Sequence, residues 1–133
     1  MDRLKRRADF IAAATGLRAR AEAFVLQARD RRDRNASRVG LTVTKKTGSA
    51  VERNRVRRRL RAVARAVVAR AGRPGFDYVL VARRSALTTP FDSLLGELER
   101  AFARLHAAGR GEPRPSGADA RTGRESNGET DGR

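Results

Sequence analysis

The chain contains no cysteine and no tryptophan among its 133 residues. Without cysteine it can form no disulfide framework, no thiolate metal site and no cysteine nucleophile, so packing alone must hold the fold together. Long apolar runs are also missing, because no segment approaches the roughly 20 apolar residues that span a bilayer. Asp9 and the lack of a leucine-rich run argue against a signal peptide. We therefore expect a cytoplasmic protein with no membrane partner.

Acidic residues are scarce: 15 Asp and Glu face 31 Lys and Arg, which gives a formal net charge of +16. Self-repulsion of this size opposes compaction unless a polyanion neutralises it. An autonomous nuclease would need a general acid and base or a carboxylate cluster for metals. The single histidine, His106, stands beside small residues, and we interpret it as a solvated surface imidazole. The composition favours a nucleic-acid-binding protein that holds no metal by itself and has no small-molecule substrate.

The composition changes at residue 109. From there to residue 133 the chain is mainly Gly, Pro, Ser, Arg, Glu and Asp, with Ala118 and Ala120 as the only apolar side chains. Such a segment cannot bury enough apolar surface to offset its ordering entropy. We predict one domain over residues 1–108 and a disordered tail over 109–133.

Hydrophobic periodicity predicts helices at both ends of the domain. Leu4, Ala8, Ile11 and Ala12 recur at helical spacing, and Gly16 stands where a left-handed residue would end the helix. The last helix opens at residues 89–92, with Thr89 as the expected cap and Pro90 at the first helical position. Its expected inner stripe is Phe91, Leu94, Leu95, Leu98, Phe102 and Leu105. Glu97 and Glu99 fall on its outer face, where pairs with Arg100 and its neighbours within the helix are the simplest expectation.

Three segments have strand patterns. Residues 23–29 and 38–44 alternate apolar and polar side chains across a charged loop, which we interpret as an antiparallel pair. Phe24 lies on the same face of its strand as Leu26 and Ala28 and is expected in the core. Residues 76–83 form a third strand pattern, and its core at 78–82 has apolar side chains on both faces, which is typical of a central strand covered on both sides. The mixture of strands and helices predicts an α+β domain with one sheet.

Residues 49–70 contain neither Gly nor Pro and begin at Ser49, a good N-cap, so they predict a long helix. At about 100° per residue, one narrow stripe faces the core. It consists of Val56, Leu60, Val63 and Val67. The opposite face carries Asn54, Arg55, Arg57, Arg58, Arg61 and Arg65, with Arg53 and Arg59 flanking the stripe and Lys45 and Lys46 just upstream.

The charge on this helix is almost entirely of one sign. Glu52 is the only nearby acid, whereas a merely solvated face usually mixes both signs. Arginine engages phosphate bidentately and stacks on bases, so the pattern favours RNA. A zipper-type DNA-binding helix would need leucine heptads downstream, and none follows Leu60. A non-catalytic, ribosomal-type RNA-binding protein remains the alternative.

Residues 45–61, which read KKTGSAVERNRVRRRLR, closely resemble the signature of the bacterial ribonuclease P protein subunit. Residues 7–10, 24–26, 38–43 and 76–83 extend the resemblance, which covers roughly residues 3–107. It implies an αβββαβα order with one mixed sheet and helices packed on it, as in the second domain of ribosomal protein S5. It also implies a protein that assists a catalytic RNA in removing the 5′ leader of precursor tRNA, with Mg²⁺ bound mainly by that RNA.

The resemblance assigns two sets of site residues. The set expected to bind the RNA subunit is Lys45, Lys46, Arg53, Asn54, Arg55, Arg57, Arg58, Arg61 and Arg65. The set expected to line a separate cleft for the leader, between the first helix and the sheet, is Phe10, Val25, Gln27, Thr42 and Thr44. Ala14 and Gln27 stand where many relatives carry aromatics, so base stacking would depend on Phe10. Packing of Phe10 in the first helix is the competing interpretation.

Overall fold

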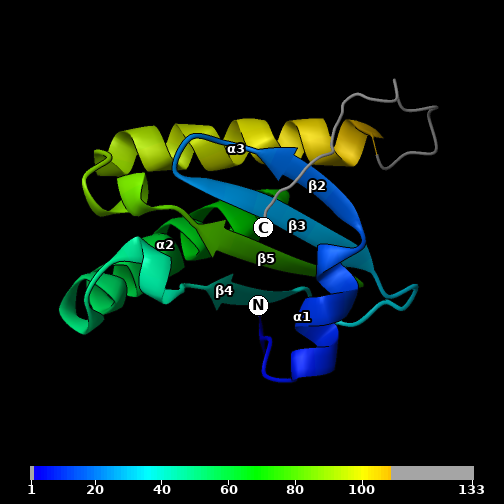
Figure 1. Ribbon diagram of the computed structural model, residues 1–133. Coiled ribbons are helices and arrows are strands. Elements are labelled where there is room, and N and C mark those ends of the chain that lie inside the picture. The colour runs from blue at the N-terminus through cyan, green and yellow to red at the C-terminus, as the bar shows by residue number, and fades with distance from the viewer. Residues whose placement is uncertain (1, 109–133) are drawn as a thin grey trace.

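The computed structural model describes residues 2–108 (Figure 1). The predicted tail at 109–133 lies outside these residues. The elements in chain order are β1 (Asp2–Arg3), α1 (Arg7–Ala14), β2 (Leu17–Arg20), β3 (Phe24–Asp30), β4 (Arg38–Thr42), the 3₁₀ turn η1 (Lys45–Thr47), α2 (Ala50–Ala71), β5 (Phe76–Ala82), the 3₁₀ turn η2 (Arg84–Leu87) and α3 (Phe91–Ala108). The α+β class and the αβββαβα order are confirmed, with β1 as an additional short strand.

The described strands form one mixed sheet in the order β1-β4-β5-β3-β2. β5 lies at the centre, antiparallel to β3 and parallel to β4. The predicted pairing of residues 23–29 with 38–44 is wrong, because β5 separates the two strands. Leu80 of β5 pairs in register with Leu26 on one side and Leu41 on the other. A strand with apolar side chains on both faces buries most of its apolar surface at the centre of the sheet, where both faces are covered.

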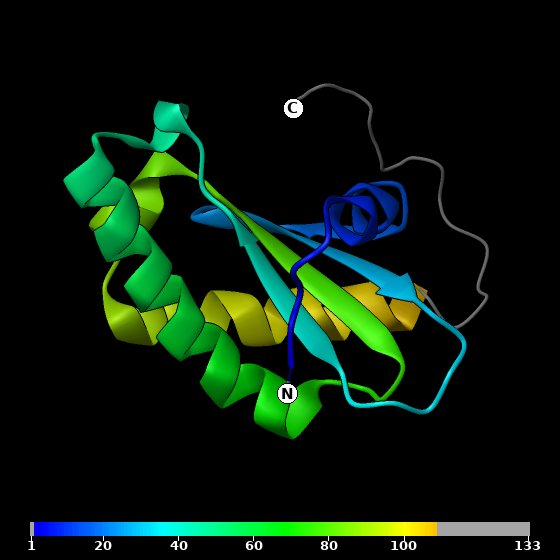
Figure 2. The same ribbon diagram turned by 90° about the horizontal axis from the view of Figure 1, so that it is seen from below.

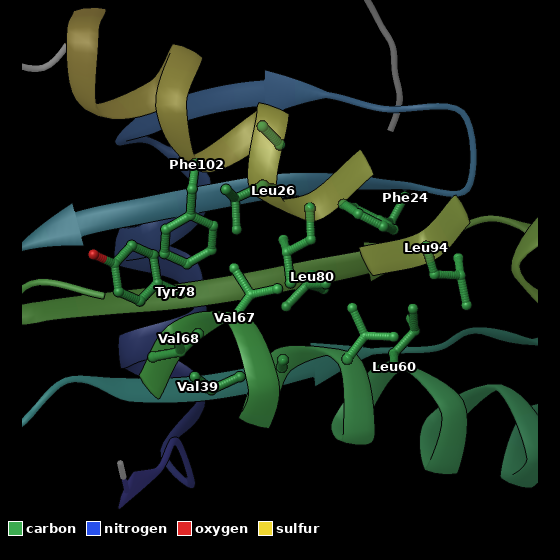
Figure 3. Close-up of a cluster of buried hydrophobic side chains, with 14 of the residues drawn as sticks. Phe24, Leu26, Val39, Leu60, Val67, Val68, Tyr78, Leu80, Leu94 and Phe102 are labelled. Atoms are coloured by element: carbon green, nitrogen blue, oxygen red, sulfur yellow. The ribbon is translucent and has the colours of Figure 1, made fainter. Parts of the chain in front are cut away.

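The sheet is covered on both faces. Figure 1 shows α1 in front of it and α2 and α3 behind it. On the α2 and α3 side, Phe24, Leu26, Tyr78 and Leu80 are fully buried in the main core (Figure 3). On the α1 side a smaller cluster forms. Its members are Leu4, Ala13 and Val79, with Phe10 and Val81 packed against them.

Helix α2 matches its predicted pattern. Its apolar stripe at Val56, Leu60, Val63 and Val67 is completely buried. Ser49 caps the helix: its hydroxyl accepts from Glu52 N–H at 3.2 Å, and Glu52 Oε1 accepts from Ser49 N–H at 2.9 Å. Glu52, the one acidic residue of this helix, is therefore engaged in a reciprocal capping box that stabilises the start of α2.

The predicted inner face of the first helix is wrong. α1 begins at Arg7, so Leu4 precedes it, and Ile11 is 55% exposed. Ala13 is buried and Phe10 half-buried, because these two, three residues apart, face the sheet. Gly16 has no left-handed backbone. Glycine is needed there because an added Cβ would lie 2.1 Å from the Ala28 carbonyl oxygen.

Helix α3 begins one residue later than predicted, at Phe91 instead of Pro90. The Thr89 hydroxyl donates to the Ser85 carbonyl at 2.6 Å instead of capping, and the helix begins at Phe91, which is 41% exposed. The rest of the stripe packs well: Leu95 is half-buried, and the fully enclosed members are Leu94, Leu98, Phe102 and Leu105.

The polar residues of α3 are used differently from the prediction. His106 is only 6% exposed, and its Nε2 lies 2.8 Å from the Tyr78 hydroxyl. Its ring packs among Phe76, Tyr78 and Phe102, so a solvated imidazole was the wrong interpretation. The two glutamates make contacts outside the helix. Glu97 accepts from Ala23 N–H at 3.0 Å, and Glu99 pairs with Arg70 of α2.

Candidate nucleic-acid interface

The outer face of α2 and the turn before it present an arginine-rich surface. Lys45 and Lys46 are exposed on η1. On α2, four of the predicted RNA-binding residues are exposed and three are half-buried. The exposed ones are Asn54, Arg55, Arg58 and Arg65, and the half-buried ones are Arg53, Arg57 and Arg61. Asn54 Oδ1 accepts from Arg57 Nη1 at 2.9 Å, which orients this guanidinium along the helix. The predicted set therefore lies on η1 and α2, and none of its members is buried.

No acid neutralises this surface within residues 2–108. None of its arginines forms an ion pair with a carboxylate there. Glu52 accepts from the Ser49 backbone and pairs with Arg84 at 3.5 Å. Partial burial, followed by the charges of Arg3, Arg65 and Arg57, lowers the pKa of the Arg61 guanidinium. A polyanion bound here would relieve that repulsion.

Other arginines of the protein are ion-paired and serve the fold. Asp77, whose side chain is fully buried, accepts from Arg38 at 2.7 Å and Arg29 at 2.9 Å, and also pairs with Arg31. Arg29 and Arg38 both reach Asp9 on α1 as well. Burial alone would raise the pKa of Asp77, but the hydrogen bonds from Arg38 and Arg31 outweigh it and the pKa is lowered. Sequence reasoning missed this cluster, whose partners lie far apart in the chain.

Arg59 also belongs to the structural group, although it stands inside the basic run. Its Nε donates to the Ala86 carbonyl at 3.1 Å, and its Nη2 donates to the Thr89 carbonyl. These bonds tie α2 to the turn that leads into α3. The basic helix therefore holds two kinds of arginine, and only those on the outer face are available to a partner.

The predicted leader cleft lies on the α1 face of the sheet. Across the sheet, Val25 and Thr42 flank Val81 in register, and both are half-buried. Gln27 pairs with Val79 and is only 9% exposed. Four of the five predicted cleft residues are thus gathered beside α1.

Thr44 is the fifth predicted cleft residue and stands apart from the others. It follows the end of β4 and is exposed at the start of η1.

Phe10 lies over β4 from α1. It is half-buried, and a Cβ added to Gly40 would lie 2.5 Å from its ring atoms Cε1 and Cζ. Glycine at position 40 therefore lets the ring rest on the strand. Phe10 therefore packs on the sheet, as one of the two interpretations expected, and its ring is not completely enclosed. Its stacking on a leader base stays a prediction. Ile11, more than half exposed beside it, is an apolar surface residue that the helical pattern had placed inside.

The described residues contain neither a metal-ligand cluster nor a membrane-spanning helix. Within 2–108, no three His, Asp or Glu side chains gather in a way that could hold a metal ion. Over the same range, no helix is both long and apolar enough to cross a bilayer.

Comparison with known proteins decides the family. A family model described as Ribonuclease P matches residues 1–106. The chain belongs to the ribonuclease P protein family. The ribonuclease P protein component of Ruegeria pomeroyi is 50% identical over 107 residues, which cover 78% of this chain and 86% of that protein. The Brucella suis protein of the same name is 40% identical over 139 residues, covering 98% and 94%.

Solved structures of the ribonuclease P family share the fold. The Staphylococcus aureus RNase P protein aligns with a TM-score of 0.65 at 26% identity, over 78% of this chain and 94% of that one. The Thermotoga maritima RNase P protein aligns with a TM-score of 0.65 at 27% identity, over 78% and 97%. The chain is therefore a protein component of ribonuclease P, the endoribonuclease of tRNA processing.

Proposed function

We propose that the protein binds the catalytic RNA of ribonuclease P through the outer face of α2 and holds the 5′ leader of precursor tRNA in the cleft beside α1. One observation carries the first part: the arginines of this face lack carboxylate partners in the described chain, whereas Arg31 and Arg38 are bound to Asp77. Unneutralised arginines on a rigid helix suit phosphate groups, which they engage with charge-assisted hydrogen bonds.

The protein supplies positioning and charge, and the RNA subunit supplies the catalysis. Lys45 and Lys46 extend the phosphate-binding surface toward the end of β4. Phe10 offers an aromatic surface to a leader base, while Val25, Gln27 and Thr42 on the α1 face of the sheet would contact the rest of the leader. Mg²⁺ is held mainly by the RNA subunit, and the arginine face lowers the local repulsion between the two RNA molecules. The complex acts in the cytoplasm and releases mature tRNA 5′ ends.

Reconstitution tests this proposal. A bacterial ribonuclease P RNA is mixed with the protein at a Mg²⁺ concentration too low for the RNA alone, and cleavage of precursor tRNA at the mature 5′ end is followed. We expect cleavage only when both components are present. The protein alone should leave the substrate intact. Absence of stimulation would instead favour a ribosomal-type scaffold protein, and cleavage without RNA would overturn the division of roles.

A further inference from the structure

Helix α1 forms one wall of the proposed leader cleft, but little apolar surface holds it there. Figure 2 shows α1, in blue, on the face of the sheet opposite α3, in yellow. Of its eight residues, all within the described chain, Ala13 alone is buried, and Phe10 is half-buried. The Arg6 side chain, at the N-cap, makes no capping bond to the first turn. A helix this short is marginal by itself, so contacts with the sheet must fix its position.

Asp9, in the first turn of α1, makes a charged contact between this helix and the sheet. Its Oδ1 accepts from Arg29 Nη2 at 3.2 Å, and its Oδ2 lies 3.5 Å from Arg38 Nη2. The Asp9 side chain is only 15% exposed. The same two guanidinium groups hold Asp77, whose side chain is fully buried in the sheet. Asp9 therefore joins α1 to arginines whose own positions are fixed by the strands.

The two arginines lie on the same face of the sheet as the predicted cleft residues. Alternate residues of a strand share one face. Arg29 therefore continues the row of Gln27 on β3, and Arg38 continues the row of Thr42 on β4. Asp77 is the register partner of both arginines on β5, which lies between them. This face thus has a charged end, which fastens α1, and an uncharged end, where the leader is proposed to bind.

The surroundings of Asp9 are strongly positive. Arg29 and Arg38 face it from the sheet, and Arg6 and Arg7 are exposed at the start of its own helix. The N-terminal end of a helix also carries partial positive charge. Without the carboxylate, α1 would bring this positive end against arginines that share a single remaining carboxylate. The attraction between helix and sheet would then become a repulsion.

We propose that Asp9 is a positioning residue for the leader: its carboxylate fastens α1 to the sheet and so sets the width of the cleft. This role rests on the proposed function, because Asp9 acts on the leader only through α1. Phe10 follows Asp9 directly in the chain and lies over Gly40. Loss of the ion pairs therefore displaces the aromatic ring without removing it, and it leaves the outer face of α2 unchanged.

Hydrogen exchange of the full-length protein tests the fastening without any RNA. Asp9→Asn keeps the size of the side chain and removes its charge. We expect the backbone amides of residues 10–14 to exchange about tenfold faster or more, as expected for a charged hydrogen bond, while those of α2 keep their rates. Asp92→Asn, at an exposed acid in the first turn of α3, is the matched control and should change exchange in α3 much less. An α1 that exchanges equally fast in the wild type and in Asp9→Asn would overturn the proposal.

Two substrates then separate the leader contact from the rest of the reaction. Cleavage by the reconstituted holoenzyme is measured for precursor tRNA with a long leader and with a leader of a single nucleotide. In Asp9→Asn the KM for the long-leader substrate should rise about tenfold, toward that of the short one, with kcat and the affinity for the RNA subunit unchanged. Asp9→Glu, which keeps the carboxylate, should restore most of the difference. A loss of stability alone would affect both substrates alike.

The outcomes distinguish failure of the Asp9 role from failure of the proposed function. If the wild-type holoenzyme cleaved the two substrates alike, the leader cleft would be rejected, and with it any role of Asp9 toward the leader. If the wild type preferred the long leader and Asp9→Asn kept the full preference, the cleft would stand and the positioning role would be rejected. A weaker affinity of Asp9→Asn for the RNA subunit would also reject it, because the change would then extend beyond α1.

Discussion

Arg38 holds Asp77 through two hydrogen bonds of 2.7 Å, from Nε to Oδ1 and from Nη2 to Oδ2. The two residues are register partners on the neighbouring parallel strands β4 and β5. The bidentate contact neutralises a carboxylate whose side chain has no exposed surface. Arg38 is thus an arginine that stabilises the fold, in contrast to the arginines on the outer face of α2, which have no carboxylate partner in the described chain.

Replacing Asp77 should strongly destabilise the protein. Asp77→Asn leaves Arg29, Arg31 and Arg38 around a neutral amide, and losing one partner of a buried ion pair costs about 3–5 kcal/mol. Urea unfolding followed by circular dichroism measures the change. Asp33→Asn, at a side chain 37% exposed, is the control and should cost far less, because solvent screens an exposed ion pair. Equal effects of the two variants would contradict a structural role for the buried cluster.

The protein should lose stability at high pH through its only tyrosine. Burial raises the pKa of Tyr78 to about 12, above the value near 10 of an unfolded chain. A folded pKa above the unfolded one adds stability that is present below about pH 10 and lost as pH rises through the folded pKa. The free energy of unfolding should fall by roughly 2–3 kcal/mol over this interval.

Ultraviolet absorbance of tyrosinate reports Tyr78 alone, because the chain has one tyrosine and no tryptophan. The titration midpoint of the folded protein should lie near pH 12. In Tyr78→Phe the fall in stability with pH should be much smaller. A midpoint close to 10 would show that the hydroxyl is solvated rather than buried.

Arg58 and Arg59 are adjacent on α2, but their substitution should have opposite effects on RNA affinity and on stability. Arg58 is exposed on the outer face, so Arg58→Ala should weaken binding to ribonuclease P RNA and lower the slope of log affinity against log salt by about 1. Arg53→Ala should behave similarly. Neither should shift the melting temperature by much, because this face contains no core residue.

Arg59→Ala provides the matched contrast on the same helix. It removes the bonds to the Ala86 and Thr89 carbonyls, which should cost about 1–3 kcal/mol of stability. RNA affinity measured well below its melting temperature should change less than in Arg58→Ala. If Arg58→Ala were the more destabilising of the two, the division between structural and RNA-binding arginines would be wrong.

The capping box at the start of α2 should contribute measurably to stability. Ser49→Ala removes the oxygen that accepts from Glu52 N–H and should cost about 1 kcal/mol. Thermal unfolding is the measurement, with Ser93→Ala, an exposed serine in the first turn of α3, as the control. No loss relative to Ser93→Ala would mean that water replaces the cap.

Local pattern was sufficient to predict much of the fold. The stripe at Val56 and Leu60, the Ser49 cap and the central position of β5 follow from helical periodicity, capping chemistry and apolar character on both parities. These signals depend on residues close in sequence. Short elements gave no such signal: β2 has four residues, and α1 is a helix of eight whose inner face was assigned wrongly.

The sequence by itself determined the basic helix, its core stripe and its uniform charge, because helical spacing alone divides those residues between two faces. Tertiary structure decided what each charge does. Asp77 gathers arginines from β3, β4 and the loop between them, and Arg59 turns to carbonyls almost thirty residues away. Arg3 reaches the arginines of α2 only because β1 joins the edge of β4. Such partners are set by strand order and long-range packing, which residue spacing along the chain does not contain.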